Sequence, residues 1–174
     1  LTLVDAANHV YQTTDNGQTL YWYMDLQQSA AGQNATRSEQ IAFAEALSLN
    51  VAGVGTIDTW RMANVDDIEA LFGSSQVTDI YRKGAYLYTE ITYPDAPVAD
   101  IVNAVVTQTG WSVDNLGHFY GRYTDPARPT AMVGLEKIFT NWDVDPDTIS
   151  TPDITSHDYQ GAWIVAVPEP ATLG

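Results

Sequence analysis

Apolar, β-branched and aromatic residues recur in short segments along the chain, often alternating with polar ones, which predicts β-strands. Four such segments precede the last strand, and they span residues 1–12, 18–26, 85–92 and 132–139. A fifth, wholly apolar run at 161–167 predicts a terminal strand. The dipeptide Asn16-Gly17 separates the first two segments and is typical of a tight hairpin turn. We therefore expect an N-terminal hairpin centred on this turn.

Three other segments repeat their apolar residues at helical spacing, and they span residues 38–49, 64–72 and 98–107. The second has the clearest ends, because Asn64 is a preferred N-cap and Gly73 a preferred stop. Asp66 and Asp67 fall in its first turn, where the helix dipole favours negative charge. We expect both carboxylates to be solvated. Thr36 or Ser38 is expected to cap the first helix.

The order of these elements predicts an α+β fold in one domain, residues 1–166. Strands come first, helices follow, and further strands end the chain, so the pattern is not the regular alternation of a parallel-sheet protein. Two polar stretches, 27–36 and 141–158, are expected to be loops. A length of 174 residues suits a single domain.

Composition narrows the classes of function. Hydrophobic residues make up 45% of the chain, enough for a core, and 22 acidic residues outnumber 7 basic ones, which gives a net charge of −15. Nucleic acid is therefore excluded as an expected partner, and anionic membranes are disfavoured, because both need a basic surface. The absence of cysteine excludes disulfide scaffolds, cysteine-based zinc sites and thiol nucleophiles. Divalent cations and neutral polysaccharides fit this charge balance.

The residues that could carry chemistry are scattered. His9, His118 and His157 share no metal-binding or catalytic spacing, so ordinary polar roles are expected for them. The alternating carboxylates of Asp143, Asp145 and Asp147 are a candidate calcium site, with Asp153 and Asp158 as further ligands. A solvated turn explains the same pattern.

Two aromatic clusters have different expected roles. Tyr21, Trp22 and Tyr23 lie in a predicted strand, where neighbours point to opposite faces, so core packing is expected for them. The cluster around Trp111, His118, Tyr120 and Tyr123 has a looser, turn-rich spacing. It is the candidate for an exposed ligand surface.

The stretch Trp60-Arg61-Met62-Ala63-Asn64-Val65-Asp66-Asp67-Ile68-Glu69-Ala70-Leu71 resembles the WRLPT signature of a widespread bacterial domain of unknown function. This resemblance implies a C-type-lectin-like fold, the fold shared with formylglycine-generating enzymes. Gly161–Val167 is similar to the closing strand of that family. The chain has Met-Ala-Asn where the signature usually has Leu-Pro-Thr. Because formylglycine-generating chemistry relies on cysteine, the resemblance implies no enzymatic activity here.

The string Val167-Pro168-Glu169-Pro170, followed by Ala-Thr-Leu-Gly, resembles the start of a PEP-CTERM sorting signal. That resemblance implies export in a Gram-negative bacterium, processing by the membrane protease exosortase, and a place at the cell surface or in the extracellular matrix. The lead residue, Leu1, is then expected to be a mature N-terminus left by signal-peptide cleavage. Proteins with this signal are associated with extracellular polysaccharide and biofilm formation.

Two functions follow as expectations. The first is a non-catalytic surface or matrix protein that self-assembles, with Leu1, Leu3, Trp163 and Val165 in terminal segments that pair with a neighbouring copy to build a filament. The alternative is a carbohydrate-binding, lectin-like module, whose binding depends on calcium if the acidic stretch binds the ion.

Overall fold

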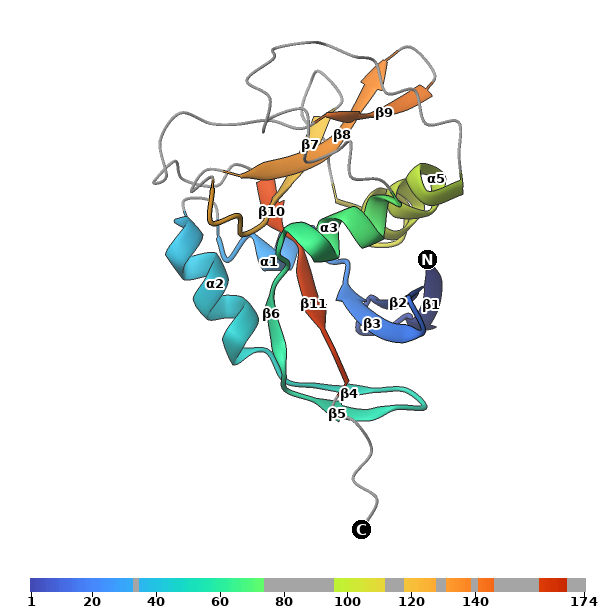
Figure 1. Cartoon of the computed structure of the whole chain (residues 1–174), viewed down its shortest axis with the longest axis vertical. Helices are drawn as coiled ribbons and strands as arrows, with labels where there is room; N and C mark the ends of the chain where they lie inside the picture. The colour runs from blue at the N-terminus through green and yellow to red at the C-terminus, as the bar shows by residue number, and fades with distance from the viewer. Residues whose placement is uncertain are drawn as a thin grey trace.

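The computed structural model describes residues 1–32, 35–73, 96–111, 118–127, 131–138, 141–145 and 160–168. Its strands form three sheets, and helices pack beside them (Figure 1). This confirms the predicted α+β class. The predicted strand at 85–92 lies outside the described residues.

The largest sheet has five strands in the order β1-β2-β3-β11-β6. Their bounds are β1 Thr2–Asp5, β2 Val10–Asp15, β3 Gln18–Tyr23, β11 Ile164–Ala166 and β6 Trp60–Met62. A second sheet has the order β10-β7-β8-β9. Its bounds are β10 Gln160–Ala162, β7 His118–Arg122, β8 Met132–Ile138 and β9 Asn141–Asp145. A separate hairpin joins β4 Leu49–Val51 to β5 Gly55–Ile57.

The N-terminal hairpin is confirmed. β2 and β3 pair antiparallel with Asp15 opposite Gln18, so Asn16 and Gly17 form a two-residue turn. Both have positive φ, 49° and 79°, as the tight turn requires. The predicted strand at 1–12 was too long, because the chain reverses between β1 and β2 at a turn that ends on His9, whose φ is 53°.

The two longest α-helices of the described residues begin at residues that were predicted to cap them. α2 (Arg37–Ala46) starts at Thr36, whose hydroxyl accepts from the Glu39 amide in a capping box. α3 (Val65–Phe72) starts at Asn64 and stops at Gly73 in the left-handed region, as predicted. The first predicted helix ended too late, because Leu49 belongs to β4.

Two further helical segments differ from expectation. α1 (Leu26–Ser29) occupies part of the predicted loop 27–36, and the Asp25 carboxylate caps it. α5 (Ala96–Val102) continues into a π-helical turn, η1 (Asn103–Thr107), so the helix predicted at 98–107 is confirmed with an earlier start.

The predicted terminal strand, 161–167, is divided in two by Trp163. β10 pairs parallel with β7 in one sheet, whereas β11 pairs antiparallel with β3 and β6 in the other. The division has a physical cause: the Trp163 amide donates to the Arg122 carbonyl, and its own carbonyl accepts from the Ala63 amide. The residue thus changes partners from one sheet to the other.

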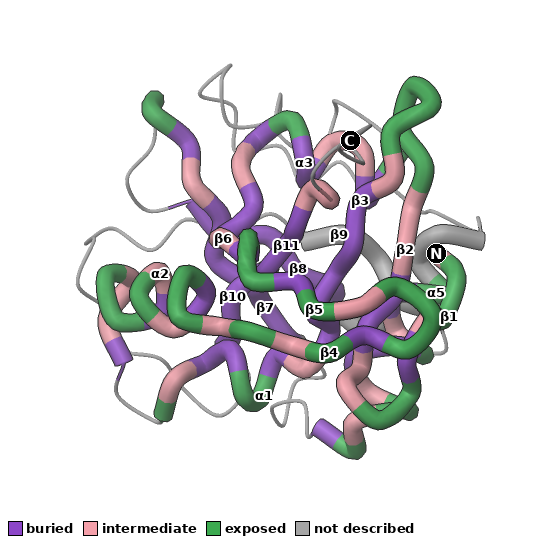
Figure 2. Tube along the Cα trace, turned by 90° about the horizontal axis from the view of Figure 1, so that it is seen from below, coloured by how far each residue is buried: buried purple, intermediate pink, exposed green. Residues whose placement is uncertain are grey.

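Both faces of the five-stranded sheet are covered, so its central strands are buried on each side (Figure 2). Val165 points into one core cluster, with Trp22, Trp163 and the apolar side of α3. Ile164 and Ala166 point into the other cluster. The predicted packing role of Tyr21, Trp22 and Tyr23 is confirmed, since all three are buried.

Candidate functional site

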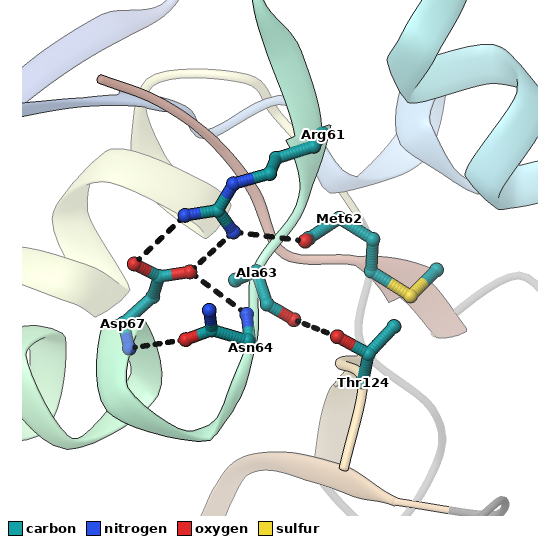
Figure 3. A network of polar contacts seen from close by, with 6 residues as sticks. All are labelled: Arg61, Met62, Ala63, Asn64, Asp67 and Thr124. Atoms are coloured by element: carbon teal, nitrogen blue, oxygen red, sulfur yellow. Dashed lines mark hydrogen bonds and ion pairs between the residues drawn. The ribbon is translucent and has the colours of Figure 1, made fainter. Parts of the chain in front are cut away.

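The stretch that begins with Trp60 and Arg61, residues 60–71, is called the tryptophan-arginine motif below. It folds into a polar network at the start of α3 (Figure 3). Arg61 Nη1 lies 2.5 Å from Asp67 Oδ2, and Arg61 Nη2 lies 3.3 Å from Asp67 Oδ1. Asp67 also accepts from the Asn64 amide at 2.8 Å, while the Asn64 side chain accepts from the Asp67 amide at 3.0 Å. The Asp67 carboxylate therefore binds both the Arg61 guanidinium and the amide of the N-cap residue, Asn64.

The same motif joins the two large sheets. The Ala63 amide donates to the Trp163 carbonyl at 2.8 Å, and the Ala63 carbonyl accepts from the Thr124 amide at 2.8 Å. The Thr124 hydroxyl adds a bond to that carbonyl at 3.3 Å. The short motif thus fixes β6, α3, the end of β7 and the crossover at Trp163 relative to one another.

One prediction about this motif was wrong. Asp66 is exposed, as expected, but Asp67 is buried and paired with Arg61. The helix dipole favours a carboxylate at either position, and only the fold decides which of the two meets the arginine of β6. The motif is a structural junction, in which Arg61, Asn64 and Asp67 bond to one another.

The predicted aromatic ligand surface is also overturned. Trp111 is 3% exposed, Tyr123 1% and Tyr120 6%. Tyr120 lies in β7, which is paired on both sides, whereas Trp111 and Tyr123 lie outside this strand and pack into the larger core cluster. Trp111 contacts Phe119 edge-on, with ring centroids 6.0 Å apart. His118 starts β7, and its side chain lies outside the described residues. The three buried aromatic residues cannot bind an external ligand in this conformation.

The first part of the candidate calcium stretch forms a strand, where a loop was predicted. Asp143 and Asp145 lie in β9, which pairs antiparallel with β8. Asp147, Asp153 and Asp158 lie outside the described residues, as does His157. Within the described part of the chain, no group of three or more histidine, aspartate or glutamate side chains is gathered as metal ligands.

The predicted assembly segments divide into buried and exposed residues. Trp163 and Val165 are fully buried, and β11 has paired strands on both edges, so the C-terminal strand is not available to a neighbouring copy. Leu1 packs partly against the core. Leu3, in the outer strand β1, is 48% exposed. Pairing of both terminal segments with a neighbour is therefore wrong for the C-terminal segment.

The chain continues from β11 into the predicted sorting signal. Val167 and Pro168 are half-buried, and the Val167 carbonyl accepts from the Thr59 hydroxyl at 3.3 Å. Glu169 and Pro170 lie outside the described residues. In Figure 1 this exit lies beside the β4–β5 hairpin, at the end of the molecule opposite β8 and β9.

Two arginines that the sequence did not single out, the half-buried Arg37 and the buried Arg122, bridge α2 to the second sheet. Arg37 donates to the carbonyls of Tyr123 and Ala131 at 2.6 and 2.9 Å. Arg122 donates to the Ala35 carbonyl and the Gln40 side chain, both at 3.2 Å. Burial, with the nearby Arg122 charge, lowers the pKa of Arg37 to about 10, so it stays a cation at neutral pH. An isolated arginine gives no sequence signal for such a role.

A third polar cluster holds the β4–β5 hairpin. The Asp5 carboxylate accepts from the Ala52 amide at 3.0 Å and from the side chain and amide of Asn8 at 2.8 and 3.1 Å. The Asn8 side chain also donates to the Asn50 carbonyl. These donors, the Ala52 amide first, lower the pKa of Asp5 below its usual value of 3.8.

Acidification is therefore expected to loosen this hairpin. Because the pKa of Asp5 is lowered on folding, its contribution to stability is complete above pH 3.8 and is lost as the pH falls through the folded pKa. Urea unfolding between pH 2 and 6 should show a steeper acid-side loss of stability for the natural chain than for Asp5→Asn. Asn8→Ala, which keeps the carboxylate but removes one donor, should fall between them. Identical pH slopes for all three would contradict the assignment.

A hollow of about 250 Å³ lies between the N-terminal strands and the end of α3. Its lining comes from two parts of the chain. The N-terminal strands contribute Leu1, Thr2, Gln12, Thr13 and Thr14, and the end of α3 contributes Ala70, Leu71 and Gly73. The Thr13 hydroxyl accepts from the Trp22 indole at 2.9 Å. The lining is neutral, which sets it apart from the acidic composition of the whole chain.

None of the helices in the described part of the chain is long and apolar enough to cross a membrane. Comparison with family models, with curated proteins and with solved structures finds no match to this chain. The assignment of function therefore depends on the chain's own residues and geometry.

Proposed function

We propose that this protein is an exported, non-catalytic domain displayed at the cell surface or in the extracellular matrix of a Gram-negative bacterium, tethered through the chain that follows β11. The observation that carries the proposal is the place of the C-terminal strand. β11 lies in the middle of the five-stranded sheet and bonds to β3 on one side and β6 on the other. The proline-rich string that resembles a sorting signal follows this strand directly.

A tether on a central strand is mechanically favourable. Hydrogen bonds of an antiparallel ladder run perpendicular to the strands, so a pull along β11 loads the bonds to both neighbours together. The flanking residue Trp163 is also bonded to both sheets, through its amide and its carbonyl. Force from the anchor is therefore spread over the core, which suits a domain held at a surface.

The lectin-like fold belongs to the same proposal. Two features support it: the tryptophan-arginine motif leads from a strand into a capped helix, and the N-terminal β3 pairs antiparallel with the C-terminal β11. The first feature agrees with the signature that the motif resembles. We propose no catalytic role, and extracellular polysaccharide is the matrix partner that the acidic, surface-displayed chain would meet.

Carbohydrate binding, with or without calcium, stays a prediction. The aromatic residues first considered for it are buried, and Asp143 and Asp145 lie in a strand. The neutral hollow lined by threonines and a glutamine is the feature that now favours such a role. Its volume of about 250 Å³ is at the small end of the range for ligand sites.

The tether is tested by changing its prolines in the natural host. Pro168→Ala with Pro170→Ala, in the full-length gene product, is expected to abolish surface display, because the sorting protease would no longer recognise the string. Immunolabelling of whole cells and fractionation of membranes measure this. Pro126→Ala, outside the tail, is the matched control and should leave display unchanged. Normal display of the doubly substituted protein would overturn the proposal.

A further inference from the structure

The outer strand β1 leaves one side of the five-stranded sheet open. β1 pairs with β2 on its inner side, and within the described residues no strand pairs with its outer side. An open edge presents unpaired backbone amides and carbonyls that can bond to a strand of another molecule. Leu3 lies in this strand with 48% of its surface exposed, and only one other large apolar side chain of the described residues, Val54, is comparably exposed.

This edge lacks the usual protection against pairing. Natural edge strands are guarded by lysine, proline or inward-turned charges, whereas Leu1-Thr2-Leu3-Val4 contains none of these. The following charge, Asp5, is buried against Ala52 and Asn8, so it does not project outward. The register of β1 with β2 is irregular between Leu3 and Asp5, which limits the regular edge to a few residues. Pairing at this edge would be short and its strength correspondingly modest.

The opposite edge of the same sheet is closed to such pairing. β6 is three residues long, and α2 packs against it. Its central residue, Arg61, is held by Asp67. A head-to-tail filament needs two different complementary surfaces. Within the described residues the outer strands of the second sheet are poor partners, because β9 carries Asp143 and Asp145, charges of the kind that guard an edge, and β10 is three residues long and packed against α1. The β1 edge is therefore left to pair with a copy of itself. The geometry therefore favours a closed pair over an open filament.

Charge identifies the occupant of the β1 edge. Each copy carries a net charge of −15, so two copies repel wherever their acidic surfaces meet. The side chains from Leu1 to Val4 are uncharged, and the Leu1 ammonium is paired with Asp100 at 3.6 Å, so an identical stretch brings no unpaired charge to the contact. A basic peptide, the other candidate, would find no outward carboxylate on β1 to pair with, since Asp5 is engaged.

We propose that two copies of this chain pair antiparallel through β1, about a twofold axis, to form one continuous sheet and a closed dimer. This inference rests on the self-association expected of a matrix protein and replaces the filament by a pair. Antiparallel pairing brings Leu3 of one copy close to Leu3 of the other. Their contact covers the exposed apolar side chain of the edge.

The natural absence of cysteine makes the test direct. In an antiparallel pair, opposed Cβ atoms lie about 4.5–5.5 Å apart, within reach of a disulfide. Leu3→Cys is therefore expected to form an intermolecular disulfide under mild oxidation and to stop at dimers. Val54→Cys is the matched control, because Val54 is 42% exposed but lies in the turn between β4 and β5. The cysteine at position 3 should crosslink about tenfold faster, since pairing raises the effective concentration of the two thiols.

Two results would overturn the dimer. One is crosslinking of Leu3→Cys no faster than that of Val54→Cys, and the other is growth of the natural chain into long oligomers during sedimentation at millimolar concentration. Leu3→Lys should weaken the natural dimer in the same sedimentation experiment by placing like charges opposite each other. Surface display provides the separate readout. Slow crosslinking together with lost display of the tail variant overturns the dimer alone, and fast crosslinking together with normal display of the tail variant overturns the tether alone.

Discussion

Replacing Trp163 by alanine is expected to remove about 3–5 kcal/mol from the free energy of unfolding. The side chain is fully buried, lies edge-on to Phe72 with ring centroids 5.9 Å apart, and donates from its indole to the Val133 carbonyl at 2.9 Å. Truncation leaves a cavity and an unpaired carbonyl at the crossover between the sheets. Since domains are stable by about 5–15 kcal/mol in total, a substantial unfolded fraction is expected.

Urea unfolding followed by circular dichroism measures this loss. Trp163→Phe separates the two causes, because it keeps an aromatic ring against Phe72 but removes the indole donor, and it should lose less stability than the alanine variant. Val54→Ala, at an exposed turn, should change the free energy of unfolding by no more than about 0.5 kcal/mol. An alanine variant at position 163 as stable as the Val54 variant would refute the central role of this residue.

Replacing Arg37 by methionine should cost about 2–4 kcal/mol, because it removes the two charge-assisted hydrogen bonds that Arg37 donates to the carbonyls of Tyr123 and Ala131. Methionine keeps an unbranched apolar stem, so the change isolates the guanidinium. The matched control is Arg61→Met, which removes a half-exposed arginine from its carboxylate partner. Arg61 bonds to Asp67 from a half-exposed position, and the buried Asp67 carboxylate keeps its bond to the Asn64 amide in this variant, so the control should lose less.

Thermal and urea unfolding of both methionine variants give the comparison. We expect the midpoint of Arg37→Met to fall clearly below that of Arg61→Met. The reverse order would mean that the Arg61–Asp67 junction, and not the two carbonyl bonds from α2, governs the attachment of the second sheet. Hydrogen exchange at β7 and β8 would then locate the weakened region.

The position of β11 connects stability with the proposed tether. A strand at the centre of a sheet cannot leave without breaking two ladders, so the attachment of the domain to its anchor is as strong as its core. The Trp163 variant should therefore weaken the tethered domain along with the fold. By contrast, the β1 edge lies at the border of the sheet and can pair with another copy without disturbing the core.

Local sequence signals predicted the parts of the fold whose causes are local. Asn16-Gly17 sets a hairpin turn, and Thr36 and Asn64 start helices because their side chains accept the free amides of the first turn. Gly73 ends α3 because it adopts the left-handed region without a steric penalty. The α+β class follows from the order of these elements.

The residues that the sequence misassigned are those whose roles depend on distant neighbours. An aromatic, turn-rich spacing indicated an exposed surface at Trp111 and Tyr123, but both pack into a core cluster built from distant parts of the chain. The last apolar run was expected to be one terminal strand that pairs with a neighbouring copy, yet Trp163 divides it between two sheets of its own chain.

By itself, then, the sequence determined where the chain turns, where its helices begin and that its net charge is strongly negative. Capping and turn conformation are properties of neighbouring residues, and net charge is a property of the whole composition. Only the tertiary structure decided which carboxylate meets Arg61, which terminal strand is buried and which edge of the five-stranded sheet is left unpaired among the described residues. Those features depend on segments that are far apart in the chain and become neighbours through packing, and no local pattern records that contact.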